Sequence, residues 1–173
     1  FEGAWLESAN LEGANLSGAN CARAVLAHAR LGGMVAIGTR FAGANLGKAT
    51  WAQSVCDEAD FTGATLSHCD FTGTQMRRAV FTGAQLLETL WGVADWSGAR
   101  LAGQVFYRLK MVGMRWPEAD LSACTFIESD LSGVDLCGAH LEGVTFATCQ
   151  LDAVSMAGAH CAGGVAVKGS SMR

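Results

Sequence analysis

The stretch Gly13-Ala14-Asn15-Leu16-Ser17-Gly18-Ala19-Asn20-Cys21 contains nearly two copies of one five-residue unit, and this unit recurs along the whole chain. In steps of five from Phe1, a large apolar residue or a cysteine occupies every position as far as Cys161, except Ala36; Ala166 is also small. Two residues before each of these positions stands a small residue, usually Ala. A period of five fits neither a helix nor a strand. We therefore interpret the chain as a repeat whose units become stable only when successive turns of chain stack.

The best-preserved units place Ala, then Asn or Asp, then Leu or Phe in sequence. They include Ala9-Asn10-Leu11, Ala14-Asn15-Leu16, Ala44-Asn45-Leu46, Ala59-Asp60-Phe61 and Ala119-Asp120-Leu121. Over essentially its whole length the chain resembles the pentapeptide-repeat family. That resemblance implies an all-β fold, a right-handed quadrilateral β-solenoid of about eight four-sided coils, with the central apolar residue and the small residue pointing inward. We expect one solenoid over residues 1–168, a tail over 169–173, and a domain of a longer polypeptide.

The composition is apolar, with 50% hydrophobic residues and a mean hydropathy of +0.24. The apolar runs are nevertheless far shorter than the ~18 residues of a membrane helix, so we assign this excess to a core. We expect a cytoplasmic, reducing location and no membrane association, because no cleavable apolar start is present and most cysteines fall on inward positions. Six of the seven are predicted to be buried as small hydrophobic side chains, and Cys137 alone to face outward. The six are Cys21, Cys56, Cys69, Cys124, Cys149 and Cys161.

The net charge is only −4. The resemblance implies one possible activity. Some family members protect DNA gyrase from quinolones, and they look like rods with the shape and charge of duplex DNA. In this chain the acidic residues are dispersed over three sides and interspersed with Arg and Lys, whereas a DNA mimic concentrates negative potential along the rod. The pattern argues against close mimicry, and we do not expect direct nucleic-acid binding. A gyrase-binding protein conferring quinolone resistance remains the alternative function.

One of the four expected sides differs from the others. On three sides the residue two positions after the central apolar residue is often Gly, which suits a corner with a positive backbone φ. On the fourth side, polar or charged residues replace this Gly. Beside this edge, outward apolar residues stack on consecutive coils, and such stripes with a polar rim mark interaction sites. The alternative is that a flat β surface tolerates apolar residues. The predicted protein-binding face comprises Leu87, Val105, Tyr107, Arg108, Ile127, Glu128, Val165 and Val167.

The coils near the middle of the chain carry too much volume for an ordinary interior. Trp91, Trp96, Phe106, Met111 and Trp116 occupy core positions, while Gln104, Leu109 and Met114 replace the small residue. Overpacking a core costs about 1 to 3 kcal/mol. We therefore predict a distortion near residues 103–117, either a swollen coil or a short loop that leaves some side chains outside. Pro117 cannot donate to a strand ladder and fits such a boundary. The phase of the tryptophans favours the core over a base-stacking platform.

Catalytic patterns are sparse. His140 and His160 occupy the same outward position on adjacent coils, but two histidines without a third ligand are weak support for a metal site. We find no nucleophile triad and no phosphate loop, so we predict a chain that is not an enzyme and that uses no cofactor or metal. We expect an interaction or scaffold module that binds a protein partner, or a second copy, through a flat face. Such arrays also look like domains of larger bacterial proteins, including adaptors for type VI secretion.

Overall fold

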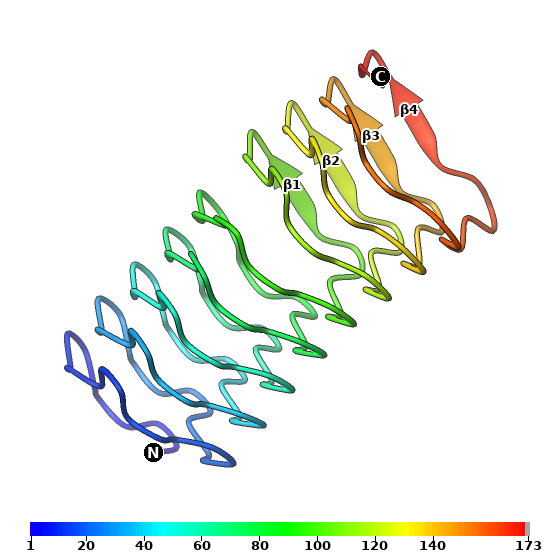
Figure 1. The fold of residues 1–173 in the computed structure, drawn as a ribbon. Helices are drawn as coiled ribbons and strands as arrows, with labels where there is room; N and C mark the ends of the chain where they lie inside the picture. The colour runs from blue at the N-terminus through cyan, green and yellow to red at the C-terminus, as the bar shows by residue number, and fades with distance from the viewer. Residues whose placement is uncertain (172–173) are drawn as a thin grey trace.

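The computed structural model describes residues 1–171 as a right-handed quadrilateral β-solenoid without helices, as the sequence predicted. The coils stack in chain order, so the two ends of the chain lie at opposite ends of the rod (Figure 1). Parallel bridges on the sides of the rod join nearly every fifth residue to the residue twenty positions later, as in Trp5 with Val25 and Asn10 with Arg30. The spacing of these bridges shows that four five-residue units complete one coil.

The unit Phe61–Thr65 illustrates why a five-residue repeat is self-consistent. The Phe61 amide donates to Val80 O at 2.8 Å on the next coil, and the Ala64 amide closes a turn on Phe61 O at 2.9 Å. The third residue of that turn, Gly63, has φ of 65°, the geometry of a type II turn. The amides of Gly63 and Thr65 donate to neighbouring coils at 2.9 Å. Four of the five amides in the unit are thus satisfied by the backbone.

The fifth amide explains the Asp or Asn of the repeat. The Thr62 amide donates to Asp60 Oδ1 at 2.9 Å, and the same contact recurs at most Asp and Asn residues in this position. Side-chain carboxylates and amides satisfy backbone groups two residues on in this way. In the unit of Pro117, Arg115 replaces the acidic residue, and proline has no amide to satisfy. Pro117 lies in a regular turn and its carbonyl accepts from the Gly98 amide at 2.8 Å, so the predicted boundary role of Pro117 is wrong.

The four sides are named here by their core residues. Side 1 contains Phe61 and Phe81, side 2 contains Leu66 and Leu86, side 3 contains Phe71 and Trp91, and side 4 contains Met76 and Trp96. The only strands longer than a single bridge in the described residues lie on side 2. They are β1 (Val105–Tyr107), β2 (Thr125–Ile127), β3 (Thr145–Ala147) and β4 (Ala166–Lys168), and they pair in parallel in that order.

The last coil departs from the count of five. In β4, Val167 is the register partner of Phe146, where the unbroken count would place Ala166. The extra residue is accommodated at Gly163 and Gly164, both of which have positive φ. Val167 therefore continues the column of Phe146, and Val165 packs partly against the core.

The end of the described solenoid also corrects the expectation for Cys161. Cys161, predicted to be buried, is exposed, because no further coil covers it in the structure. Ser171 still bridges Gln150, so regular pairing extends past residue 168 into the predicted tail. Residues 172–173 of that tail lie outside the described residues.

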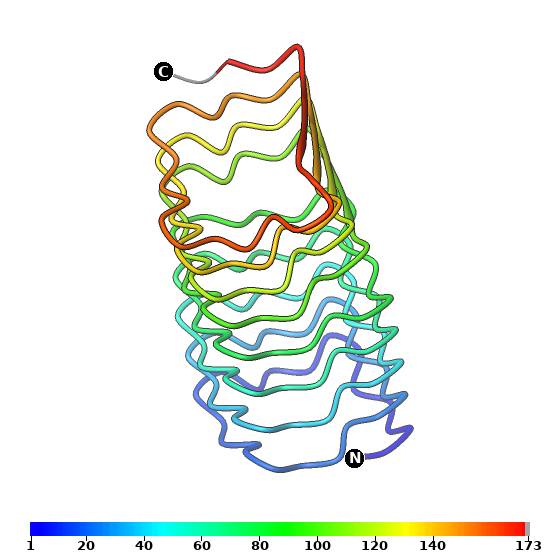
Figure 2. The same cartoon turned by 90° about the vertical axis from the view of Figure 1, so that its right-hand side faces the viewer.

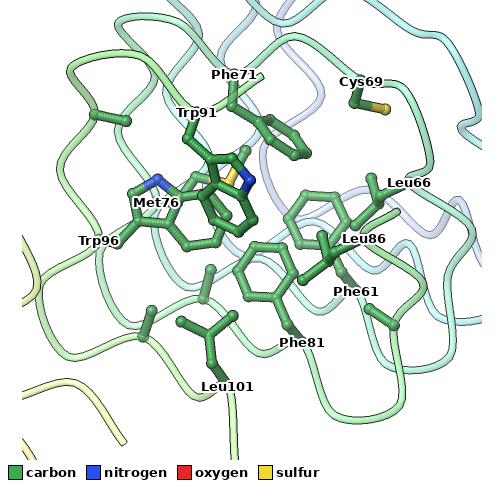
Figure 3. Close-up of a cluster of buried hydrophobic side chains, with 14 of the residues drawn as sticks. Phe61, Leu66, Cys69, Phe71, Met76, Phe81, Leu86, Trp91, Trp96 and Leu101 are labelled. Carbon is green, nitrogen blue, oxygen red and sulfur yellow. The ribbon is translucent and has the colours of Figure 1, made fainter. Parts of the chain in front are cut away.

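Aromatic rings fill the interior from coil to coil. Phe61 is fully buried and stacks between Phe41, at a centroid distance of 5.2 Å, and Phe81, at 5.0 Å. Trp91 and Trp96 lie against each other at 4.6 Å, and Figure 3 shows them beside Phe71 and Met76. The expectation that the tryptophans belong to the core is confirmed for Trp91, Trp96 and Trp116.

The predicted burial of five cysteines is also confirmed, and Cys137 is half-buried. Desolvation raises the pKa of the Cys69 and Cys124 thiols to about 12. The Cys69 thiol lies 3.1 Å from Leu46 O, within the rod. These thiols are protonated at neutral pH and behave as small core side chains.

Candidate protein-binding site

The edge of side 2 carries side chains at a strained backbone position. Its residues adopt the left-handed conformation, with φ between 50° and 62°. A residue with a Cβ pays of the order of 1–3 kcal/mol in this region, whereas Gly does not. Non-glycine residues at this position are scattered on the other sides, but here they occupy eight consecutive coils. They are Ser8, His28, Lys48, His68, Glu88, Arg108, Glu128 and Thr148.

Acidic and basic side chains alternate over three coils of this edge, at Glu88, Arg108 and Glu128. Arg108 donates to Glu128 Oε2 at 2.6 Å, and this hydrogen bond raises the pKa of the guanidinium. The same guanidinium lies 4.8 Å from the centre of the Tyr107 ring. His68 Nδ1 lies 3.3 Å from Glu88 Oε2. The edge therefore carries alternating rather than acidic charge, and exposed pairs of this kind add little to stability.

Arginines neutralise acidic side chains elsewhere on the rod. Arg77 donates to Asp57 Oδ2 at 2.6 Å, and Arg78 lies 2.5 Å from Glu58 Oε1. Arg30 makes a paired contact with Glu12 at 2.9 Å. These contacts join neighbouring coils, so the acidic residues do not add up to a continuous negative surface.

The predicted face is only partly assembled by the structure. Leu87, Val105 and Tyr107 are exposed, with 60% and 62% of the two aliphatic side chains accessible, and Ile127 is half-buried. Val165 does not join this stripe, because it packs partly against the core. Val167 is exposed, but the extra residue in the last coil places it in register with Phe146 instead of with Ala147. Arg108 and Glu128 border the stripe as an ion pair.

Three exposed apolar residues on side 3 extend the stripe and were missed by the sequence reasoning. Together with the first three they account for six of the ten large apolar side chains exposed in the described residues. The repeat assigns these three residues to outward positions, but on side 3, next to the column of Leu87 and Tyr107 and not within it. We call this group the apolar patch: Leu87, Leu90, Val93, Val105, Tyr107 and Val112.

The apolar patch surrounds an interruption of the hydrogen-bond ladder. Elsewhere in residues 1–171 the parallel bridges follow one another coil by coil, but Gln85 with Val105 and Leu90 with Lys110 form none. In the coil below, Leu66 N donates to Gln85 O at 2.8 Å and His68 N to Leu87 O at 2.9 Å. Within the described chain, no backbone hydrogen bond joins residues 82–93 to residues 101–113.

The turn at Trp91 shows one cause of this interruption. Val93 stands where other units carry a residue with positive φ, and it does not adopt that conformation, which a β-branched residue resists. The positive φ moves to Gly92, at 48°. A Cβ on Gly92 would lie 2.7 Å from Thr72 Oγ1, so only glycine fits there. Gly73 N consequently donates to Val93 O, one residue later than the repeat requires.

A second cause is Gln104, which replaces the small inward residue. Its Nε2 donates to Phe81 O at 2.9 Å and to Ala84 O at 3.1 Å. In the coil below, the equivalent carbonyl of Ala64 accepts from the Gln85 amide at 2.9 Å. Gln104 therefore occupies the carbonyl that the Val105 amide would use to close the ladder. The bulk of Trp91, Phe106 and Trp116 adds to the separation of the two coils. Their ring centroids lie 5.6 to 6.1 Å apart.

The result is a cleft of about 830 Å³ between two coils. Figure 2 shows the wider spacing between these green and yellow-green coils, which is confined to one side of the rod. The expected distortion is therefore present, as a wider separation of two coils with the large core side chains kept inside. It lies between residues 82–93 and 101–113, earlier than predicted. The cleft is lined by Thr72, Leu87, Glu88, Thr89, Leu90, Trp91, Gly92, Tyr107, Arg108, Leu109 and Lys110.

The remaining candidates form no catalytic arrangement. The rings of His140 and His160 stack at 4.7 Å, and His140 Nδ1 lies 3.7 Å from Glu142 Oε1. Over residues 1–171, no three His, Cys, Asp or Glu side chains gather closely enough to hold a metal ion. That part of the chain also contains no helix with the length and apolar character needed to cross a membrane.

Comparison with known proteins establishes the family. The model for pentapeptide repeats matches in eight copies, over residues 1–33, 19–50, 39–78, 59–89, 112–143 and 119–158. These ranges cover most of the chain, which therefore belongs to the pentapeptide-repeat family. They leave out residues 90–111, the segment that forms much of the cleft. No curated protein sequence matches the chain significantly.

Solved structures agree on the fold. A trypsin-treated form of QnrB1, a plasmid-mediated fluoroquinolone resistance protein, matches with a TM-score of 0.78 and 18% identity over 99% of this chain and 87% of that one. HetL from the cyanobacterium Nostoc, involved in heterocyst differentiation regulation, matches with a TM-score of 0.63 and 22% identity, covering 99% and 90% of the two chains. Identities this low support a common architecture and not a common activity.

Proposed function

We propose that this chain is a non-enzymatic protein-binding module that engages its partner through the apolar patch and the charged edge of side 2. The observation that carries the proposal is the coincidence of the two features. Apolar side chains gather on a surface that is otherwise polar, and the edge beside them keeps charged residues at backbone positions where glycine would be less strained. An apolar centre with a polar rim is the usual anatomy of a protein interface.

A larger bacterial protein is the proposed context of this module. A pentapeptide array can serve as one domain of a bacterial adaptor, such as those of type VI secretion, and a rigid rod with one differentiated face suits that scaffold role. Self-association through the same face fits the proposal equally. A cytoplasmic setting agrees with the free, buried cysteines.

Gyrase binding is the second candidate, because the QnrB1 fold superimposes over nearly the whole chain. Against it, arginines pair with acidic side chains from coil to coil, so this rod lacks the continuous negative surface of a DNA mimic. The experiment below distinguishes the two candidates.

The test is affinity capture from a bacterial lysate with three baits, followed by binding measurements with each purified protein that is captured. The second bait carries Leu87→Asp, Tyr107→Asp and Ile127→Asp on side 2. The third is a matched control that adds the same charge on other sides. It carries Ile37→Asp, Thr62→Asp and Thr82→Asp, all at exposed positions.

Support requires a purified partner that binds the unchanged chain and the control bait with equal affinity. Its affinity for the side 2 bait must be at least tenfold lower. Equal binding by all three baits would place the functional surface elsewhere. Binding of purified gyrase that survives the side 2 substitutions would favour the quinolone-resistance alternative.

A further inference from the structure

The two walls of the cleft present backbone groups that the fold leaves unpaired. On the lower wall, the amides of Leu86, Glu88 and Trp91 have no backbone partner among the described residues. On the upper wall, the carbonyls of Val105 and Tyr107 accept no hydrogen bond from the lower wall, although the equivalent carbonyls of Gln85 and Leu87 accept from the coil below them. The Lys110 amide and the Thr89 carbonyl are likewise unpaired across the cleft, so each wall presents both donors and acceptors.

Unpaired backbone edges of this kind are templates for an additional strand. The cleft differs from an ordinary sheet edge because it has two such walls facing each other. An extended segment between them would donate hydrogen bonds to both walls and accept hydrogen bonds from both, as a central strand does. Paired donors and acceptors along both walls specify a polypeptide backbone better than they specify a compact small molecule.

The lining adds a preference for side chains. Leu87, Leu90 and Trp91 on the lower wall and Tyr107 and Leu109 on the upper wall are apolar. Lys110 lies at the rim and forms no ion pair in the described structure, whereas Arg108 is bound to Glu128. The volume of about 830 Å³ lies within the usual range of ligand sites, roughly 300 to 1,000 Å³.

From these observations we infer that the cleft admits an extended, largely apolar peptide segment of a partner protein, with an acidic residue facing Lys110, as an inserted β-strand. This inference deepens the proposed function, since it specifies how the partner binds and what its contacting segment looks like. The partner can contact Ile127 and Tyr107 on side 2 in addition to the cleft.

The test uses displayed random nonapeptides selected on the complete chain. The blocked variant is Leu90→Asp, which removes an apolar wall residue and restores the acidic residue found at the equivalent positions Asp70 and Asp130, so the variant is expected to fold. Ile37→Asp, on side 4, is the matched control. We expect selected peptides rich in Val, Ile, Leu or Phe with one Asp or Glu, whose affinity falls at least tenfold for Leu90→Asp and is unchanged for Ile37→Asp.

Two further readouts separate strand insertion from apolar adhesion. N-methylation of a selected peptide should weaken binding about fivefold for each donor removed, and the larger effect is expected in the phase whose amides face the carbonyls of Val105 and Tyr107. Amide exchange followed by NMR should be fast for Leu86, Glu88 and Trp91 in the free chain and slow in the complex. The amides of Leu66 and His68, which are bonded in the coil below, should be protected in both states.

The inference is overturned if no peptide is enriched relative to Leu90→Asp, if N-methylation has no effect at any position, or if the wall amides are already as protected as Leu66. These failures differ from a failure of the proposed function. A protein partner that depends on Tyr107 and Ile127 but binds Leu90→Asp normally would leave the proposed function standing without the inserted strand.

Discussion

Replacement of Phe61 by Ala should remove about 4 kcal/mol from the free energy of unfolding. The Phe61 side chain has no exposed surface and stacks on Phe41 at 5.2 Å and on Phe81 at 5.0 Å, with an edge contact to Trp51 at 5.7 Å. Truncations of buried Phe cost roughly 3 to 5 kcal/mol, and losing the stacked aromatic neighbours favours the middle or upper part of that range.

The structure also indicates that the cavity cannot easily collapse. The walls at this level are held by ladder hydrogen bonds from Phe61 N to Val80 O at 2.8 Å and from Gly63 N to Thr82 O at 2.9 Å. A cavity whose walls do not relax is the costly case. Phe61→Leu is the matched control, because the same column contains Leu101 and Leu121, and we expect it to cost roughly 1 to 2 kcal/mol.

The assay is guanidinium unfolding followed by tryptophan fluorescence and by circular dichroism. Both probes are needed because repeat arrays can unfold in parts, and a free energy is defined only where the transitions coincide. A loss below about 1 kcal/mol for Phe61→Ala with an unchanged m-value would refute the assignment of Phe61 to a rigid interior column.

Three further predictions concern polar groups and thiols. Burial raises the pKa of Cys69 to about 12 from the ordinary 9.0, so above pH 9 the folded chain keeps a proton that the unfolded chain loses. The contribution of each such thiol to the free energy of unfolding should be constant below pH 9 and then fall by about 1.4 kcal/mol per pH unit. Cys69→Ala should reduce the slope by the contribution of one thiol in unfolding measurements from about pH 8 to 10.5. Asp120→Ala should cost about 1 kcal/mol in the same assay, because Asp120 accepts from the Ser122 amide at 3.0 Å, whereas Asp120→Asn should cost less, and equal losses would contradict the turn-capping role. Native thiol labelling with mass spectrometry should modify the exposed Cys161 first and the half-buried Cys137 second; rapid labelling of Cys69 would contradict its burial.

The sequence predicts the fold of this chain well because the determining interactions are local and repeated. Each unit carries its own inward residue, its own turn and, in many units, its own capping Asp or Asn. The contact of Asp60 with the Thr62 amide, for example, involves residues two positions apart. The period therefore contains most of the information needed to build the coil.

Features that depend on a single exception are predicted less well. The volume argument recognises overpacking around Trp91 and Phe106, but not that Val93 and Gln104 decide where the ladder opens. Val93 acts through a backbone dihedral, and Gln104 acts through carbonyls twenty and twenty-three positions earlier. Neither effect follows from the size of the residue.

The misplaced residues of the predicted face have a similar origin. Gly163-Gly164 fits the count of five in the sequence, yet the pair accommodates one extra residue and places Val167 in register with Phe146. Cys161 follows the inward phase correctly, but burial also requires a coil above it. Position in the repeat specifies direction, whereas burial depends on the neighbouring coil.

The interrupted ladder also has a mechanical consequence. Between the two separated coils, the remaining backbone hydrogen bonds lie on sides 1 and 4, as in Phe81 N to Arg100 O at 2.9 Å and Trp96 N to Arg115 O at 2.8 Å. A pull along the rod is shared by four columns elsewhere and by two at this level. We therefore expect two stiff segments joined by an off-centre hinge, which bends toward or away from the corner between sides 2 and 3 and ruptures first under tension.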